Sequence, residues 1–196
     1  MMKYAVFGGT FDPPHTGHLA IAKAALEALD IDELIWIPAA KNPIKRWSNT
    51  SPQSRLAMVL SMVESEPRMS VSDIEITRGG DSFAIDTIKE LRKVRPGKYW
   101  FVLGSDALST MTSWKQPEKL LEICRLLVVA RFGTELGNVL DQLPKYVQSS
   151  IDVVDERIKD ISSTMIRDAI PDGSDFDHLV TKEVAKYIEE QQLYRE

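Results

Sequence analysis

The stretch YAVFGGTFDPPHTGH, residues 4–18, decides how the rest of the chain is interpreted. Residues 4–7 are aromatic, β-branched or small and apolar, which predicts a short buried strand. Gly8 and Gly9 follow at once, and apolar residues return at helical spacing from Leu19 onward. Glycine lets a backbone approach an anion closely, and the first turn of a helix offers N–H groups and a favourable dipole. The order strand, glycine turn, helix therefore predicts a site for phosphate.

Two of the chain's three histidines, His15 and His18, lie at this junction. Three residues apart at the start of a helix, they point to the same side. Imidazoles beside helix N–H groups can donate hydrogen bonds to phosphoryl oxygens whose charge changes during a reaction. Their joint position disfavours the alternative of incidental turn residues, and a zinc site lacks further ligands nearby. The stretch matches neither a P-loop nor a G-x-G-x-x-G fingerprint.

Predicted strands and helices alternate along the whole chain. The runs that predict strands are residues 4–7, 34–37, 69–76, 99–103, 126–130 and 151–154, and helical spacing occurs at residues 19–29, 56–63, 85–91 and 180–188. This alternation is typical of a doubly wound α/β domain, in which helices cover both faces of a mostly parallel sheet. We interpret residues 1–196 as one Rossmann-like domain of this class, closed by C-terminal helices, with a short helix and a loop in residues 133–149.

A second turn is expected beside the first. In doubly wound sheets, ligands bind beyond the carboxyl ends of the strands, where the strand order reverses. If the order is 3-2-1-4-5, the first and fourth strands flank that point, and they end in Gly8-Gly9-Thr10 and Gly104-Ser105-Asp106. Both turns should then face one crevice.

A second candidate anion site, Ile161-Ser162-Ser163-Thr164-Met165-Ile166-Arg167, follows the last predicted strand. Ser and Thr at a helix start are ordinary N-caps, and alone they would carry no functional meaning. Arg167 lies three residues beyond Thr164, so its guanidinium can reach back to the start of the helix and bind a phosphate. The hydroxyls, the N–H groups and the guanidinium together predict the site.

The composition and net charge indicate which kinds of partner and environment the protein is suited to. With 43% hydrophobic and 27% charged residues, the chain is typical of a soluble globular protein, and its formal charge of −5 disfavours broad binding to nucleic acid. No apolar segment has the length of a membrane span. The single cysteine, Cys124, lies in an apolar run and is interpreted as a buried residue in a reducing compartment. We expect a cytoplasmic protein; the sequence leaves open whether it forms a homo-oligomer.

The two motifs, H-x-G-H at residues 15–18 and I-S-S-T-x-I-R at residues 161–167, resemble those of the nucleotidylyltransferase superfamily. More narrowly, the chain is similar to bacterial nicotinate mononucleotide adenylyltransferases, a family of NAD biosynthesis. The similarity runs nearly end to end and extends to residues 42–45, 55–58, 82–87 and 104–106, Trp114 and Arg131. It implies transfer of AMP from ATP to nicotinate mononucleotide, with Mg²⁺ carried by the ATP.

The resemblance also assigns residues to roles. It implies that His15, His18 and Arg167 act on the reacting phosphates. The ATP site would add Gly8, Gly9, Thr10, Phe11, Gly104, Asp106, Ile161, Ser163 and Thr164. The mononucleotide site would comprise Lys45, Phe83, Ala84, Thr87, Asp106, Trp114 and Arg131, with Trp114 stacked on the pyridine ring.

Three departures from the family pattern fall on the acceptor side. The family often has Pro-His-Lys where this chain has Pro43-Ile44-Lys45, and Tyr-Thr where it has Phe83-Ala84. Nicotinamide mononucleotide and phosphopantetheine therefore remain alternative acceptors, and cytidylyltransferases share H-x-G-H with a different C-terminal signature. A catalytically silent nucleotide-binding module is the alternative of another class, disfavoured by the presence of both histidines.

Overall fold

The computed structural model contains one parallel sheet of six strands, in the order β3-β2-β1-β4-β5-β6. It describes residues 1–44, 48, 50–131, 136–158 and 161–195. The strands are β1 (Lys3–Gly9), β2 (Glu33–Pro38), β3 (Met69–Val71), β4 (Lys98–Gly104), β5 (Arg125–Arg131) and β6 (Ile151–Ile158). The α-helices are α1 (Thr16–Ala28), α2 (Pro52–Val63), α3 (Ile74–Arg78), α4 (Ala84–Val94), α5 (Ser105–Leu108), α6 (Pro117–Leu121), α7 (Leu136–Asp141), α8 (Lys145–Gln148), α9 (Ser163–Ala169) and α10 (Lys182–Glu190), and the 3-10 helices are η1 (Met111–Ser113) and η2 (Asp177–Leu179).

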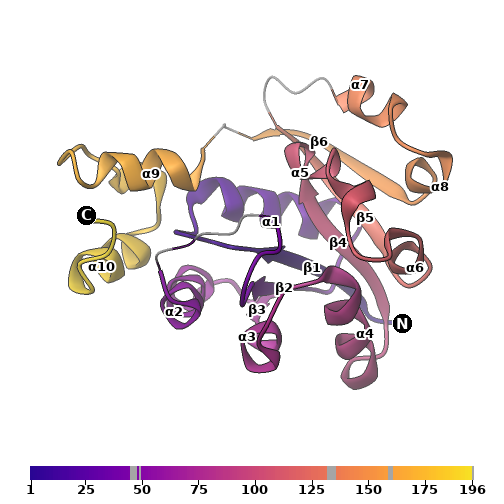
Figure 1. Cartoon of the computed structure of the whole chain (residues 1–196), viewed down its shortest axis with the longest axis horizontal. Helices are drawn as coiled ribbons and strands as arrows, with labels where there is room; N and C mark the ends of the chain where they lie inside the picture. Colours follow the sequence, from indigo (N-terminus) through magenta and orange to yellow (C-terminus); the bar gives the residue numbers. More distant parts are fainter. Residues whose placement is uncertain (45–47, 49, 132–135, 159–160, 196) are drawn as a thin grey trace.

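The central strands are apolar on both faces because each face is covered by helices. In β1, Phe7 belongs to one hydrophobic cluster and Val6 to the other, and Trp36 and Ile35 of β2 divide in the same way. Successive strand residues point to opposite faces, so a doubly covered strand has no polar side. Helices α1, α2, α9 and α10 contribute to the first cluster, and α4, α5, α6 and α8 to the second. Figure 1 shows α9 and α10 together at one end of the molecule and α6, α7 and α8 at the other.

The predicted fold class and strand order are confirmed, with β6 added beyond β5. One predicted element is wrong in extent: the run 69–76 was expected to be a strand throughout, but β3 ends at Val71 and α3 begins at Ile74. The Ser72 hydroxyl accepts a hydrogen bond from the N–H of Ile74, and the Thr77 hydroxyl donates to Asp73. These local bonds to short polar side chains favour a helix start over continued pairing.

Both C-terminal helices begin at a hydroxyl cap, of which the one at the start of α9 was predicted. The Ser162 hydroxyl accepts from the N–H of Met165 at the start of α9, and the Thr181 hydroxyl accepts from the N–H of Val184 at the start of α10. The expected short helix within residues 133–149 is present as α7, and α8 follows it. No helix in the described ranges is long and apolar enough to cross a membrane.

Candidate active site

The site lies where the strand order reverses. β1 pairs in parallel with β4, and the chain leaves them in opposite directions across the sheet, through β2 and β3 on one side and β5 and β6 on the other. The ends of β1 and β4 therefore flank the reversal point, as predicted.

The two glycines are required by aromatic packing. A Cβ built on Gly8 would lie 2.9 Å from the Phe101 ring, and one on Gly9 would lie 2.8 Å from the Phe11 ring. Phe11 has a left-handed backbone (φ 52°), uncommon for a bulky residue, and its side chain is 2% exposed. Phe11 therefore belongs to the packed core at this turn, where its ring contacts Phe7 and Trp36.

His15 and His18 cap the start of α1 reciprocally. The Nδ1 of His15 accepts from the N–H of His18, and the Nδ1 of His18 accepts from the N–H of His15, each at 3.3 Å. The rings are stacked with centroids 3.6 Å apart, so the predicted common orientation is confirmed. Because Nδ1 is an acceptor in both, each neutral ring carries its proton on Nε2. The caps thus fix two imidazoles as Nε2–H donors.

Helix α9 is tied directly to the first turn. Ser163 Oγ donates to the carbonyl of Pro13 at 2.9 Å, and Arg167 Nη1 donates to the carbonyl of Asp12 at 2.7 Å. Arg167 Nη2 also donates to Thr164 Oγ1 at 3.2 Å, so the expected reach back to the helix start is present. Ile161 lies against this junction: a Cβ on Gly17 would come within 3.4 Å of it. The two candidate phosphate sites are therefore one structural unit.

Arg55 of α2, a candidate cation within the family match at residues 55–58, supports the site through contacts that the sequence did not predict. It is 2% exposed and donates to the carbonyls of Thr10 (2.7 Å), Ala39 (2.6 Å), Ala40 (3.3 Å) and Thr50 (3.4 Å). Burial lowers its pKa from the ordinary arginine value, and the charge of Asp12 opposes that shift. Arg55 joins the ends of β1 and β2, and its family match at residues 55–58 was the available signal.

The predicted acceptor side gathers around the start of α4. Phe83 and Ala84 are half-buried there, and Lys115 Nζ lies 4.5 Å from the Phe83 ring centroid and 2.8 Å from Asp86. The adjacent Trp114 is half-buried, packs edge-on against Phe101, and donates from Nε1 to Thr110. The structure thus brings Phe83 and Trp114 into one neighbourhood through Lys115.

Thr87 does not line this surface. Its side chain is 0% exposed, and its hydroxyl donates to Glu75 Oε1 and accepts from Arg78. Burial raises the pKa of the Glu75 carboxyl above its usual value, although the hydrogen bonds and Arg78 act in the opposite direction. Thr87 supports the start of α4 from beneath, and its predicted direct contact with a mononucleotide is corrected accordingly.

The structure describes only some of the remaining predicted residues. Gly104 ends β4 as predicted, and the next residue, Ser105, is 1% exposed with no hydrogen-bond partner for its hydroxyl among the described residues. Lys45 lies outside the described residues, as do the side chains of Asp106 in α5 and Arg131 in β5. In the part of the chain that is described, no three His, Cys, Asp or Glu side chains gather as metal ligands.

Two capped helix starts, locked together at the reversal point of a doubly wound sheet, define a nucleotide-handling α/β protein. Residues 6–169 match the model of the cytidylyltransferase-like family. Relatives in Herpetosiphon aurantiacus (37% identical, 99% of each chain) and Gemmatimonas aurantiaca (40% identical, 100% of this chain and 93% of the relative) both carry the name "Probable nicotinate-nucleotide adenylyltransferase". The chain belongs to the cytidylyltransferase-like family and, within it, to the nicotinate-nucleotide adenylyltransferases.

Solved structures agree on the fold. A Plasmodium falciparum nicotinic acid mononucleotide adenylyltransferase, in complex with NaAD, superimposes with a TM-score of 0.79 at 20% identity over 99% of this chain and 98% of that chain. A Vibrio parahaemolyticus structure described as a nicotinate-nucleotide adenylyltransferase gives a TM-score of 0.70 at 20% identity, covering 100% of this chain and 97% of that one.

Proposed function

We propose that this protein transfers AMP from ATP to nicotinate mononucleotide, producing deamido-NAD and pyrophosphate. The observation that carries the proposal is the pair of capped imidazoles, His15 and His18, held beside α9 by Arg167 and Ser163. The identity of the acceptor is inferred from the names of the two relatives that align with nearly the whole chain at 37% and 40% identity.

The reaction needs alignment and charge stabilisation. An oxygen of the mononucleotide's 5′-phosphate attacks the α-phosphorus of ATP, the bond to the β-phosphate bridging oxygen breaks, and pyrophosphate leaves with that electron pair. The Nε2–H groups of His15 and His18 donate to phosphoryl oxygens during transfer, and Arg167 together with the N–H groups of α9 holds the nucleotide from the other side. Mg²⁺, bound to the ATP phosphates, neutralises part of their charge.

The acceptor contacts follow the family pattern with substitutions. Trp114 stacks on the pyridine ring, and the backbone at Phe83 and Ala84 meets its carboxylate. Lys45 and Arg131 contribute positive charge to the mononucleotide, and Asp106 binds ribose hydroxyls. Lys115, which lies over Phe83, is paired with Asp86 at 2.8 Å, so this pair adds no net charge beside the acceptor surface.

Pyrophosphate release distinguishes the candidate acceptors. The purified protein is incubated with Mg²⁺ and ATP and, in separate reactions, with nicotinate mononucleotide, nicotinamide mononucleotide or phosphopantetheine. We expect release with the first at a higher kcat/KM than with the second, and none with phosphopantetheine. Activity with phosphopantetheine alone would overturn the acceptor, and silence with all three would favour a nucleotide-binding module.

A further inference from the structure

The C-terminal tail, residues 191–195, reaches the turn that begins the site. Tyr194 Oη donates to Asp12 Oδ1 at 2.6 Å, although the two residues are 182 positions apart. Asp12 is 6% exposed, so this bond is shielded from competing water. The tail thereby contacts a residue three positions before His15.

Asp12 is held by its backbone and its side chain at once. Its carbonyl accepts from Arg167 of α9, and its carboxylate accepts from Tyr194 of the tail. The guanidinium of Arg55 acts on the same pair electrostatically from α2. Three segments from distant parts of the chain therefore meet at one residue of the turn.

Tyr194 is a donor at neutral pH. Burial, followed by the charge of Asp12, raises the pKa of the Tyr194 phenol above its ordinary value. The phenol keeps its proton, and a hydroxyl that donates to a carboxylate makes a stronger bond than a neutral pair.

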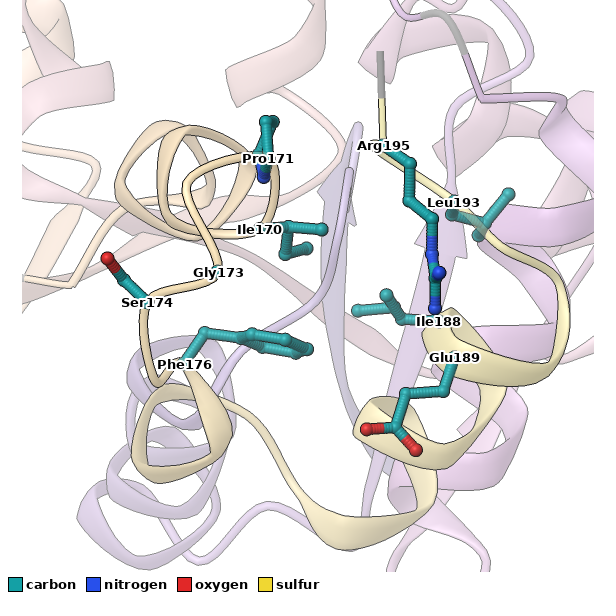
Figure 2. Close-up of a pocket in the computed structure, with 9 residues that line it drawn as sticks. All are labelled: Ile170, Pro171, Gly173, Ser174, Phe176, Ile188, Glu189, Leu193 and Arg195. Atoms are coloured by element: carbon teal, nitrogen blue, oxygen red, sulfur yellow. The ribbon is translucent and has the colours of Figure 1, made fainter.

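The residues on either side of Tyr194 line a pocket beside the end of α9. Leu193 and Arg195 line a pocket of about 440 Å³ together with Ile170 and Phe176, which follow α9, and Ile188 of α10 (Figure 2). Gln192 and Tyr194 have left-handed backbones, with φ values of 51° and 62°. Such conformations persist where surrounding contacts hold them. Tyr194 also packs against the first hydrophobic cluster, and the N–H of Leu193 donates to the carbonyl of Ile188 in α10. The bond to Asp12 is the contact that joins this anchored tail to the turn.

We propose that Tyr194 is a positioning residue of the adenylyl transfer: its hydroxyl holds Asp12, and through Asp12 the turn that presents His15 and His18 to the ATP phosphates. The proposal rests on the proposed function. Without the bond, the turn samples other arrangements, and ATP binding must order it. The loss therefore affects ATP more than the acceptor.

Tyr194→Phe removes the hydroxyl and keeps the ring, and Tyr187→Phe on α10 is the matched control. Initial rates of pyrophosphate release are measured while ATP and nicotinate mononucleotide are varied separately. For Tyr194→Phe we expect kcat/KM for ATP to fall about tenfold, with a rise in KM for ATP of roughly threefold and a change below about twofold in KM for the mononucleotide. A purely structural loss would lower the active fraction and leave both KM values unchanged.

Two further measurements isolate the bond. In an Asp12→Ala background, Tyr194→Phe should change kcat/KM for ATP less than about twofold, because the partner is already gone. Amide exchange of a peptide covering residues 8–18 should accelerate in Tyr194→Phe, while the β4 peptide exchanges as in the wild type. The exchange result does not depend on activity, so it tests the bond even if the wild type proves inactive with every acceptor. Wild-type kinetics in Tyr194→Phe, additive effects in the double variant, or unchanged exchange would overturn the proposal.

Discussion

The two histidines combine a structural and a chemical function in one ring each. His15 is 2% exposed and caps α1, yet the same cap leaves its proton on Nε2. An imidazole can accept a hydrogen bond from a helix N–H with one nitrogen and donate to a ligand with the other. A serine cap has a single hydroxyl and offers no second donor of fixed direction. The spacing of three residues therefore serves both purposes.

His18→Ala tests this arrangement. It removes one Nε2–H donor and the acceptor for the N–H of His15. We expect kcat to fall by about 10²–10³, the scale for losing a donor to developing charge. The free energy of unfolding should fall by only about 0.5–1.5 kcal/mol for the lost cap bond. Pyrophosphate release and urea denaturation measure the two effects; near-normal turnover in a folded variant would remove His18 from the mechanism.

Arg55→Lys tests whether the planar guanidinium is required. Lysine cannot reproduce a fork that bonds carbonyls at Thr10 and Ala39 together, so buried acceptors lose their partners. We expect the free energy of unfolding to fall by about 2–4 kcal/mol at an unchanged denaturant m-value. The exposed Arg92→Lys serves as the control and should change it by less than about 0.5 kcal/mol. Equal denaturation midpoints for the two variants would contradict the assignment.

At the scale of elements, the sequence predicted what depends on local pattern. The strands around Phe7, Trp36 and Val102 were located because doubly covered strands are continuously apolar. The strand expected over residues 69–76 failed after Val71, since its apolar residues suit a short helix equally well and Ser72 and Asp73 decide the matter by local hydrogen bonds. Periodicity cannot resolve runs this short.

Glu75→Gln tests the junction of α3 with α4 through pH dependence. The Glu75 pKa is raised in the folded state, so folding favours the protonated form. Its contribution to stability is full below the unfolded pKa of about 4.3 and is lost as pH rises through the folded value. Glutamine removes this loss, so the unfolding free energy of the variant relative to the wild type should increase with pH. Chemical denaturation between acid and neutral pH measures it, with exposed Glu118→Gln as control. A constant difference would contradict the prediction.

Across the whole molecule, the site joins segments that the sequence does not place together. The family resemblance named Arg167 and the histidines, but nothing local links Arg55 to the end of β1 or Tyr194 to Asp12. These contacts follow from how α2 and α10 pack on one face of the sheet, which is a tertiary result. The phosphate-facing residues were found because they belong to recognisable phosphate-binding motifs. Residues that hold the turn in place belong to no such motif, so the sequence did not reveal them.

Contacts at the amino ends of the strands should affect the stability of the protein without affecting catalysis. Asp152, near the start of β6, accepts from Arg125 of β5 at 2.7 and 3.0 Å and from Trp100 of β4 at 2.8 Å, so it ties three neighbouring strands together. The hydrogen bonds from Arg125 lower the pKa of this carboxyl. Its stabilisation is therefore present above the unfolded pKa and lost as pH falls through the lower folded value.

Asp152→Asn should accordingly reduce the free energy of unfolding by about 1–2 kcal/mol at neutral pH, where the charge-assisted bonds are intact. The difference from the wild type should shrink towards zero in acid, because the wild-type carboxyl is then neutral as well. The kcat for pyrophosphate release should stay within about twofold, since the reacting groups lie beyond the opposite ends of the strands. Urea denaturation across pH and steady-state kinetics test both parts. A difference in unfolding free energy that does not change with pH would refute an electrostatic origin of the stabilisation. A large fall in kcat would show that the amino and carboxyl ends of the strands are coupled.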